Sequence, residues 1–162
     1  MFLIFASFGT AQEGKTEQIQ ATYDQQKDVT TIVLNPFVLV SRRYEELRLG
    51  AMTSYKGKVK VRPKEVALIL VSLSKSDVNR YESARKLTVI FDGESVSLGE
   101  TQRSKQSQNG VFIESMLAVL PFDTLLKIAN AKDVTIKLGL TSVKLSSEHL
   151  TKLRAAASYM TS

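Results

Sequence analysis

The fold is decided by the stretch Leu87-Thr88-Val89-Ile90-Phe91-Asp92-Gly93-Glu94-Ser95-Val96-Ser97-Leu98. Two runs of residues with high β propensity flank an Asp-Gly pair, which readily adopts the positive φ angles that a tight hairpin turn requires. We therefore predict an antiparallel hairpin with its turn at Asp92-Gly93. Asn109-Gly110 has the same chemistry and predicts a second turn, from which the chain returns as a long strand over residues 111–120.

Strand patterns also precede this hairpin. Residues 29–34 are rich in β-branched side chains, and Asn35-Pro36 interrupts them before residues 37–40 resume, either as another strand or as a bent continuation. Residues 47–55 alternate between apolar and more polar positions, which favours a strand with one face more exposed to solvent than the other. Residues 66–71 are apolar at both parities, so we expect a central strand that is covered on both faces.

Two helices are predicted in the C-terminal half. The first begins after Pro121 and ends near Asn130, and the second begins after Ser146, a residue type preferred at a helix N-cap. Leu145 and Leu150 are spaced to pack against each other around that cap. We therefore expect a mainly β fold with two short helices, either an antiparallel β-sandwich or a partly closed sheet.

Length and composition indicate one domain with a narrow range of chemistry. The chain has 162 residues, of which 43% are hydrophobic and 23% charged, as is ordinary for a globular domain. It contains no cysteine and one histidine, His149. This composition excludes disulfides, thiolate metal sites, cysteine nucleophiles and multi-histidine metal sites, and we expect no cofactor.

The first residues have the pattern of an export signal. Residues 1–11 are apolar and end in small side chains, as in the second half of a secretory signal, although no basic segment precedes them. The alternative is a buried N-terminal strand. We interpret residues 1–11 as a truncated signal peptide, 12–16 as a polar leader and 17–162 as a single β-rich domain. No run is long enough to span a bilayer, so no transmembrane segment is expected.

The order of signals from Arg85 onward resembles that of a known group of proteins. The chain first contains a strand with an Asp-Gly turn, then a strand that ends at a proline, and then a short helix. These signals lead to residues 128–139, Ile-Ala-Asn-Ala-Lys-Asp-Val-Thr-Ile-Lys-Leu-Gly, and then to residues 145–150, Leu-Ser-Ser-Glu-His-Leu. This pattern is similar to uncharacterised β-rich bacterial proteins that are secreted or associated with the cell envelope. The resemblance covers about half of the chain and rests mostly on structural signals. It implies an exported domain and assigns no catalytic residue.

The strongest binding candidate is a basic run between two predicted strands, Lys56-Gly57-Lys58-Val59-Lys60-Val61-Arg62-Pro63-Lys64. Residues two apart share a face of an extended chain, so the cations would form a ladder with a spacing of about 7 Å. The cations are Lys56, Lys58, Lys60, Arg62 and Lys64. A polyanion carries charges at a similar repeat. The alternative is that lysines and Pro63 protect an edge strand from aggregation.

Other basic and imidazole groups are weaker candidates. His149 is not expected to be catalytic, because neighbours within one helical turn do not converge as a catalytic triad requires. We expect it to be an exposed residue in the first turn of the last helix. Three arginines surround Tyr44, and the sequence does not settle whether they lie beside the ladder. These arginines are Arg42, Arg43 and Arg48.

Acidic residues provide the enzymatic alternative. Glu114 interrupts an apolar strand, and we expect it to be a solvated or salt-bridged side chain on a partly wet face. A carboxylate-dependent hydrolase or transferase would require Glu114 to lie within roughly 5 to 10 Å of a second acid, such as Asp92 or Glu94. A weaker alternative is a small-ligand carrier with a cavity between the sheet and the helices.

The function expected from these patterns is a non-enzymatic, exported binding module of the bacterial envelope. A formal net charge of +6 favours an anionic surface polymer as partner, and another protein is the alternative. Nucleic acid is an unlikely partner, because only Tyr55 lies near the basic run and a single ring is no stacking platform. The sequence does not indicate the oligomeric state.

Overall fold

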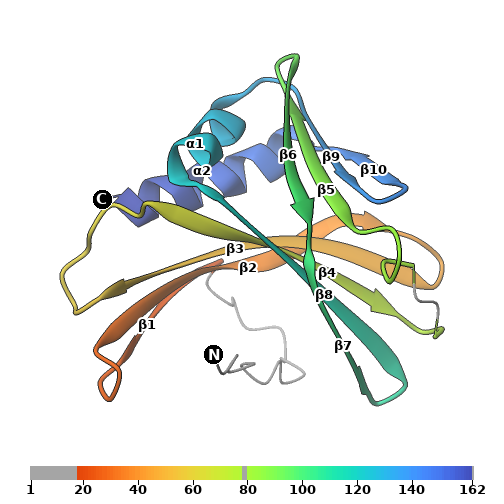
Figure 1. Cartoon of the computed structure of the whole chain (residues 1–162), viewed down its shortest axis with the longest axis horizontal. Helices are drawn as coiled ribbons and strands as arrows, with labels where there is room; N and C mark the ends of the chain where they lie inside the picture. The colour runs from red at the N-terminus through yellow and green to blue at the C-terminus, as the bar shows by residue number, and fades with distance from the viewer. Residues whose placement is uncertain (1–17, 78–79, 162) are drawn as a thin grey trace.

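Figure 1 shows the computed structural model of the chain, which describes residues 18–77 and 80–161. The described residues form ten strands and two helices. In chain order these are β1 (Ile19–Asp24), β2 (Val29–Ser41), β3 (Glu45–Lys56), β4 (Glu65–Ser74), β5 (Lys86–Phe91), β6 (Glu94–Glu100), β7 (Gln102–Gln108), β8 (Val111–Pro121), α1 (Phe122–Asn130), β9 (Val134–Leu138), β10 (Thr141–Lys144) and α2 (Ser147–Thr161). The signal peptide predicted over residues 1–11 and the leader over 12–16 lie outside the described residues.

The strands form two antiparallel sheets, and the expected mainly β fold with two helices is confirmed. One sheet has the order β1-β2-β3-β4-β8-β7, the other has the order β10-β9-β5-β6, and neither closes into a barrel. The helices and the smaller sheet cover the same face of the larger sheet (Figure 1). The core lies between these layers, and Leu34, Leu49, Leu70, Val89 and Met160 are fully buried in it. None of the described helices combines the length and apolarity needed to cross a membrane.

Both predicted hairpin turns are confirmed. Asp92 and Gly93 have φ angles of 46° and 83°, and they connect β5 to β6 with Phe91 opposite Glu94. Asn109 and Gly110 have φ angles of 51° and 75° and connect β7 to β8. Both non-glycine residues tolerate the left-handed region because their short polar side chains suit it. The sequence did not predict β7 itself, since its residues carry no apolar alternation.

The predicted break at Asn35-Pro36 is a bend within one long strand. β2 continues through both residues, and its register against β3 shifts between Leu34 and Phe37. Gly50 of β3 allows this bulge, because a Cβ atom there would lie 2.7 Å from the Leu34 carbonyl oxygen and 3.1 Å from Cγ of Pro36. The alternative of a bent continuation is therefore correct.

The central position predicted for residues 66–71 is confirmed, while their burial is uneven. β4 lies between β3 and β8, and Val66, Leu68 and Leu70 are buried in the core. Ala67 and Ile69 point to the other face of the sheet and are half-buried. The expectation of full cover on both faces is therefore wrong for the outer face.

The last helix begins with a reciprocal cap. The Ser146 hydroxyl accepts the His149 N–H at 3.2 Å, and Nδ1 of His149 accepts the Ser146 N–H at 3.1 Å. The imidazole also stacks on Phe37, with 5.4 Å between the ring centroids. His149 is therefore half-buried and structural, and the expectation of an exposed side chain is wrong. Leu145 and Leu150 are both buried in the core, as expected for a hydrophobic staple.

Candidate functional site

The basic run predicted as a ladder lies in the loop between β3 and β4. β3 ends at Lys56 and β4 begins at Glu65, so residues 57–64 connect two inner strands of the larger sheet. The run therefore does not form an edge strand, and edge protection does not explain its lysines. We call residues 56–64 the basic loop.

The side chains of the basic loop turn toward different elements. Nζ of Lys58 lies 4.8 Å from the ring centroid of Tyr23 in β1. Lys60 donates to the Tyr159 carbonyl oxygen of α2 at 2.7 Å, and its Nζ lies 4.1 Å from the ring of that residue. Arg62 pairs with Asp123 of α1 at 2.6 Å. The expectation of one cationic face with regular spacing is therefore wrong, because residues 57–64 form no strand and these three side chains contact three different elements.

The basic loop nevertheless keeps its positive charge at the surface. Lys56, Lys58, Arg62 and Lys64 are all exposed. Contacts with aromatic rings do not neutralise a charge, and the exposed pair of Arg62 and Asp123 is largely screened by solvent. Within the described residues, no acidic side chain pairs with the three exposed lysines.

Backbone hydrogen bonds hold both ends of the basic loop. The Gly57 N–H donates to the Asp28 carbonyl at 2.8 Å, and the Thr30 hydroxyl donates to the Gly57 carbonyl at 2.6 Å. At the other end, the Phe122 N–H donates to the Lys64 carbonyl at 2.9 Å. These bonds, together with the contacts of Lys60 and Arg62, order the loop before any partner binds, which lowers the entropic cost of binding.

A shallow hollow of about 460 Å³ lies beside the basic loop. Its floor is the outer face of the sheet at Met52 and Ala67, and Val61 and Pro63 of the loop line its rim. Val119 of β8 also lines it and is 57% exposed. The loop therefore borders an apolar part of the sheet surface.

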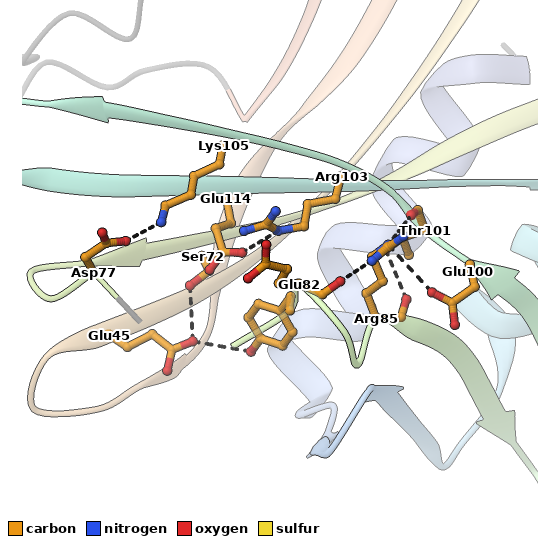
Figure 2. A network of polar contacts seen from close by, with 11 residues as sticks. Glu45, Ser72, Asp77, Glu82, Arg85, Glu100, Thr101, Arg103, Lys105 and Glu114 are labelled. Carbon is orange, nitrogen blue, oxygen red and sulfur yellow. Dashed lines mark hydrogen bonds and ion pairs between the residues drawn. The ribbon is translucent and has the colours of Figure 1, made fainter. Parts of the chain in front are cut away.

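A buried polar network lies at the other end of the larger sheet (Figure 2). Ser72 of β4 is directly opposite Glu114 of β8, and its hydroxyl donates to Oε1 of Glu45 at 3.1 Å. The Tyr81 hydroxyl lies 3.3 Å from the same oxygen and 3.2 Å from the Thr141 hydroxyl. Burial raises the pKa of Tyr81, so its phenol stays protonated.

Glu114 belongs to this network as a salt-bridge partner. Its side chain is 3% exposed, and its Oε2 lies 2.7 Å from Nε of Arg103 in β7. The expectation of a partly wet face is wrong, because Met116 on the same face is fully buried. The expectation of an ion pair is confirmed.

The acid pair required by the enzymatic alternative does not form. Asp92 accepts the Lys132 and Asp133 N–H groups, each at 3.0 Å, and thereby closes the segment after α1. The β5–β6 turn that carries Asp92 and Glu94 lies at the end of this hairpin remote from β7 and β8 (Figure 1). Neither residue is therefore a partner for Glu114.

The small-ligand carrier and a metal site are the remaining possibilities for ligand binding. Two hollows in the described part of the chain lie beside the basic loop and at residues 42–45. A small-ligand carrier would instead hold its ligand between the sheet and the helices, and neither of these two hollows lies there. Among residues 18–77 and 80–161, no group of three or more acidic or histidine side chains is placed to hold a metal ion.

No family model, curated protein or solved structure matches the chain. The resemblance to exported bacterial proteins therefore stays a prediction.

Proposed function

We propose that this protein is a non-enzymatic binding module, exported to the bacterial cell envelope, whose basic loop contacts an anionic surface. One observation carries the proposal: two exposed valines stand between the cations of the loop. Val59 is 80% exposed and Val61 is 55% exposed. Segments that lie in a membrane interface combine lysine or arginine with apolar side chains that enter the boundary between headgroups and acyl chains. The anionic surface favoured by the loop is therefore that of a lipid bilayer.

Electrostatic attraction supplies most of the expected affinity. Each lysine or arginine near an anionic bilayer contributes about 1 kcal/mol, and the attraction falls off within a Debye length. The basic loop carries five such residues on a chain with a formal net charge of +6. Because the loop is already ordered, little of this energy is lost in fixing its conformation. Reversible, salt-sensitive binding is the expected behaviour.

A charge-removal variant tests the proposal. Lys56→Gln, Lys58→Gln and Lys64→Gln remove three exposed charges but spare the hydrogen bond of Lys60 and the ion pair of Arg62. At about 1 kcal/mol per charge, the triple variant is expected to bind anionic vesicles about 100-fold more weakly in low salt. Vesicle co-sedimentation of the chain from Gln12 onward measures this without the apolar start.

The matched control removes three exposed lysines elsewhere. Lys86→Gln and Lys137→Gln lie in the smaller sheet, and Lys132→Gln follows α1. This control has the same net charge as the loop variant, so general electrostatics would weaken both equally. Equal loss in the two variants, or no loss in the loop variant, would contradict a specific role for the basic loop.

A second comparison separates a bilayer from a soluble anionic polymer. Val59→Ser with Val61→Ser removes the apolar tips, whereas Leu140→Ser removes a 97% exposed leucine from the β9–β10 turn. The double serine variant is expected to bind vesicles about tenfold more weakly and to bind polyphosphate unchanged. Equal binding of vesicles by wild type and the double variant would favour a polymer, and the Leu140 control is expected to behave as wild type.

A further inference from the structure

A second hollow, of about 300 Å³, lies at the end of the larger sheet opposite to the basic loop. It opens where β3 begins and β4 ends, at the register pair Glu45 and Ser74. Three arginines, three serines, a tyrosine and a glutamate line it: Arg42, Arg43, Tyr44, Glu45, Ser72, Ser74, Ser76 and Arg80. We call it the arginine pocket.

Glu45 forms the inner wall of the arginine pocket and keeps one oxygen without a hydrogen bond. Its side chain is 10% exposed, and Oε1 accepts from the Ser72 and Tyr81 hydroxyls. Oε2 lies 2.9 Å from Nε of Arg80 and 3.7 Å from a guanidinium nitrogen of Arg42. Both contacts are ion pairs without hydrogen-bond geometry, so Oε2 is a buried, charge-paired oxygen that accepts no hydrogen bond from a described residue. A carboxylate oxygen can accept a hydrogen bond in addition to such ion pairs, so a ligand hydroxyl at Oε2 would be stabilising.

The pocket also carries more cations than its single carboxylate balances. Arg80 and Arg42 both contact Glu45, and their side chains are 45% and 40% exposed. Arg43 is exposed, and its guanidinium lies 5.2 Å from the Tyr44 ring centroid, with no ion pair to a described residue. A guanidinium binds a carboxylate through two parallel hydrogen bonds, so the outer part of the pocket suits an organic anion.

We propose that the arginine pocket binds a hydroxylated organic acid of the size of one acidic sugar unit. The carboxylate of the ligand would pair with Arg43 at the mouth, and a ring hydroxyl would donate to Oε2 of Glu45 at the wall. The volume of about 300 Å³ is at the lower end of small-ligand pockets. The site is independent of the basic loop, because the two lie at opposite ends of β3.

The wall of the pocket is ordered before a ligand enters. Tyr81 is 1% exposed and links Glu45 to Thr141 of β10, so the smaller sheet supports the carboxylate from behind. Ser74 is 8% exposed and donates to the Ser76 carbonyl at 2.8 Å, which fixes the start of the segment after β4. A preorganised carboxylate of this kind favours ligands whose hydroxyl has a defined position relative to the anion.

Titration calorimetry with glucuronate on the full chain tests the proposal. Glucose, which lacks the carboxylate, and acetate, which lacks the hydroxyls, are each expected to bind at least tenfold more weakly than glucuronate. Arg43→Gln is expected to weaken glucuronate binding at least tenfold, and it alters an exposed side chain that contacts only the exposed ring of Tyr44 among the contacts described above. Arg48→Gln, in the adjoining strand β3 but outside the pocket, is the matched control and is expected to bind as wild type.

Four binding results would overturn the proposed ligand or the role of a pocket residue. Equal binding of acetate and glucuronate would overturn the role of Oε2, and equal binding of glucose would overturn the role of the arginines. Unchanged binding by Arg43→Gln, or absence of glucuronate binding, would overturn the site. An oligomer of the same acid identifies the source: tighter binding than the monomer supports a polymer unit, and tighter binding of the monomer supports a free acid. Failure of vesicle binding would leave this result unaffected.

Discussion

Replacement of Glu114 by alanine is expected to lower the free energy of unfolding by about 3–5 kcal/mol. Glu114 is 3% exposed and forms an ion pair with Arg103, which is itself 18% exposed. Glu114→Ala therefore removes a buried carboxylate that pairs with this largely buried guanidinium, and it also opens space beside Ser72. Urea denaturation followed by circular dichroism measures the loss.

Two controls separate the ion pair from general effects of substitution. Glu94→Ala removes an exposed acid at the start of β6, and we expect a change within about 0.5 kcal/mol. Arg103→Met with Glu114→Leu replaces both partners by apolar side chains of similar length, and is expected to recover most of the stability lost by Glu114→Ala. A loss below about 1 kcal/mol in Glu114→Ala would contradict the buried ion pair.

Gly139→Ala is expected to destabilise the fold by about 3–4 kcal/mol. Gly139 has a φ of +56°, and an added Cβ atom would lie 1.9 Å from the Ala84 carbonyl oxygen. The turn cannot move away easily, because the Gly139 N–H donates to the Lys86 carbonyl at 3.0 Å. The β9–β10 turn and the start of β5 would therefore separate, and the smaller sheet would lose part of its packing.

Gly110→Ala is the matched control for this prediction. Gly110 also has a positive φ, +75°, but an added Cβ atom would meet nothing within 4 Å. Its expected cost is about 1 kcal/mol, which is the conformational penalty alone. Equal losses of stability in Gly139→Ala and Gly110→Ala would show that the close approach to Ala84 contributes nothing.

Local signals in the sequence predicted most of the larger architecture. The turns at Asp92-Gly93 and Asn109-Gly110 depend on backbone angles that few residue pairs adopt, so each pair identifies its hairpin without tertiary information. The cap at Ser146 is likewise a local feature, since its partners lie within one helical turn. These elements were predicted because the determining atoms are close together in the chain.

The missed features depend on contacts between distant segments. β7 consists of polar residues and is a strand because β8 pairs with it, and Arg103 faces Glu114 only after that pairing. The basic loop looked extended in sequence, yet Tyr23, Asp123 and Tyr159 draw its side chains apart. No local pattern encodes such contacts.

The arginine pocket was partly visible in the sequence. Arg42 and Arg43 were recognised as a basic group near Tyr44, but their position relative to the basic loop was not. They lie at the opposite end of β3 from Lys56, and Arg80 joins them from the segment that follows β4. The buried position of the Glu45 carboxylate had no sequence signal, because it depends on hydrogen bonds from Ser72 and Tyr81, which are distant in the chain.

Entry of the basic loop into an anionic lipid surface is tested most directly by a fluorophore at the tip of the loop. The chain contains no cysteine, so Val59→Cys provides a unique position for an environment-sensitive label, and Leu140→Cys, whose native side chain is also exposed, provides a control. Anionic vesicles are expected to shift the emission at position 59 to shorter wavelength, reversibly in high salt, with no shift at position 140. No shift at position 59, or equal shifts at both positions, would contradict the account.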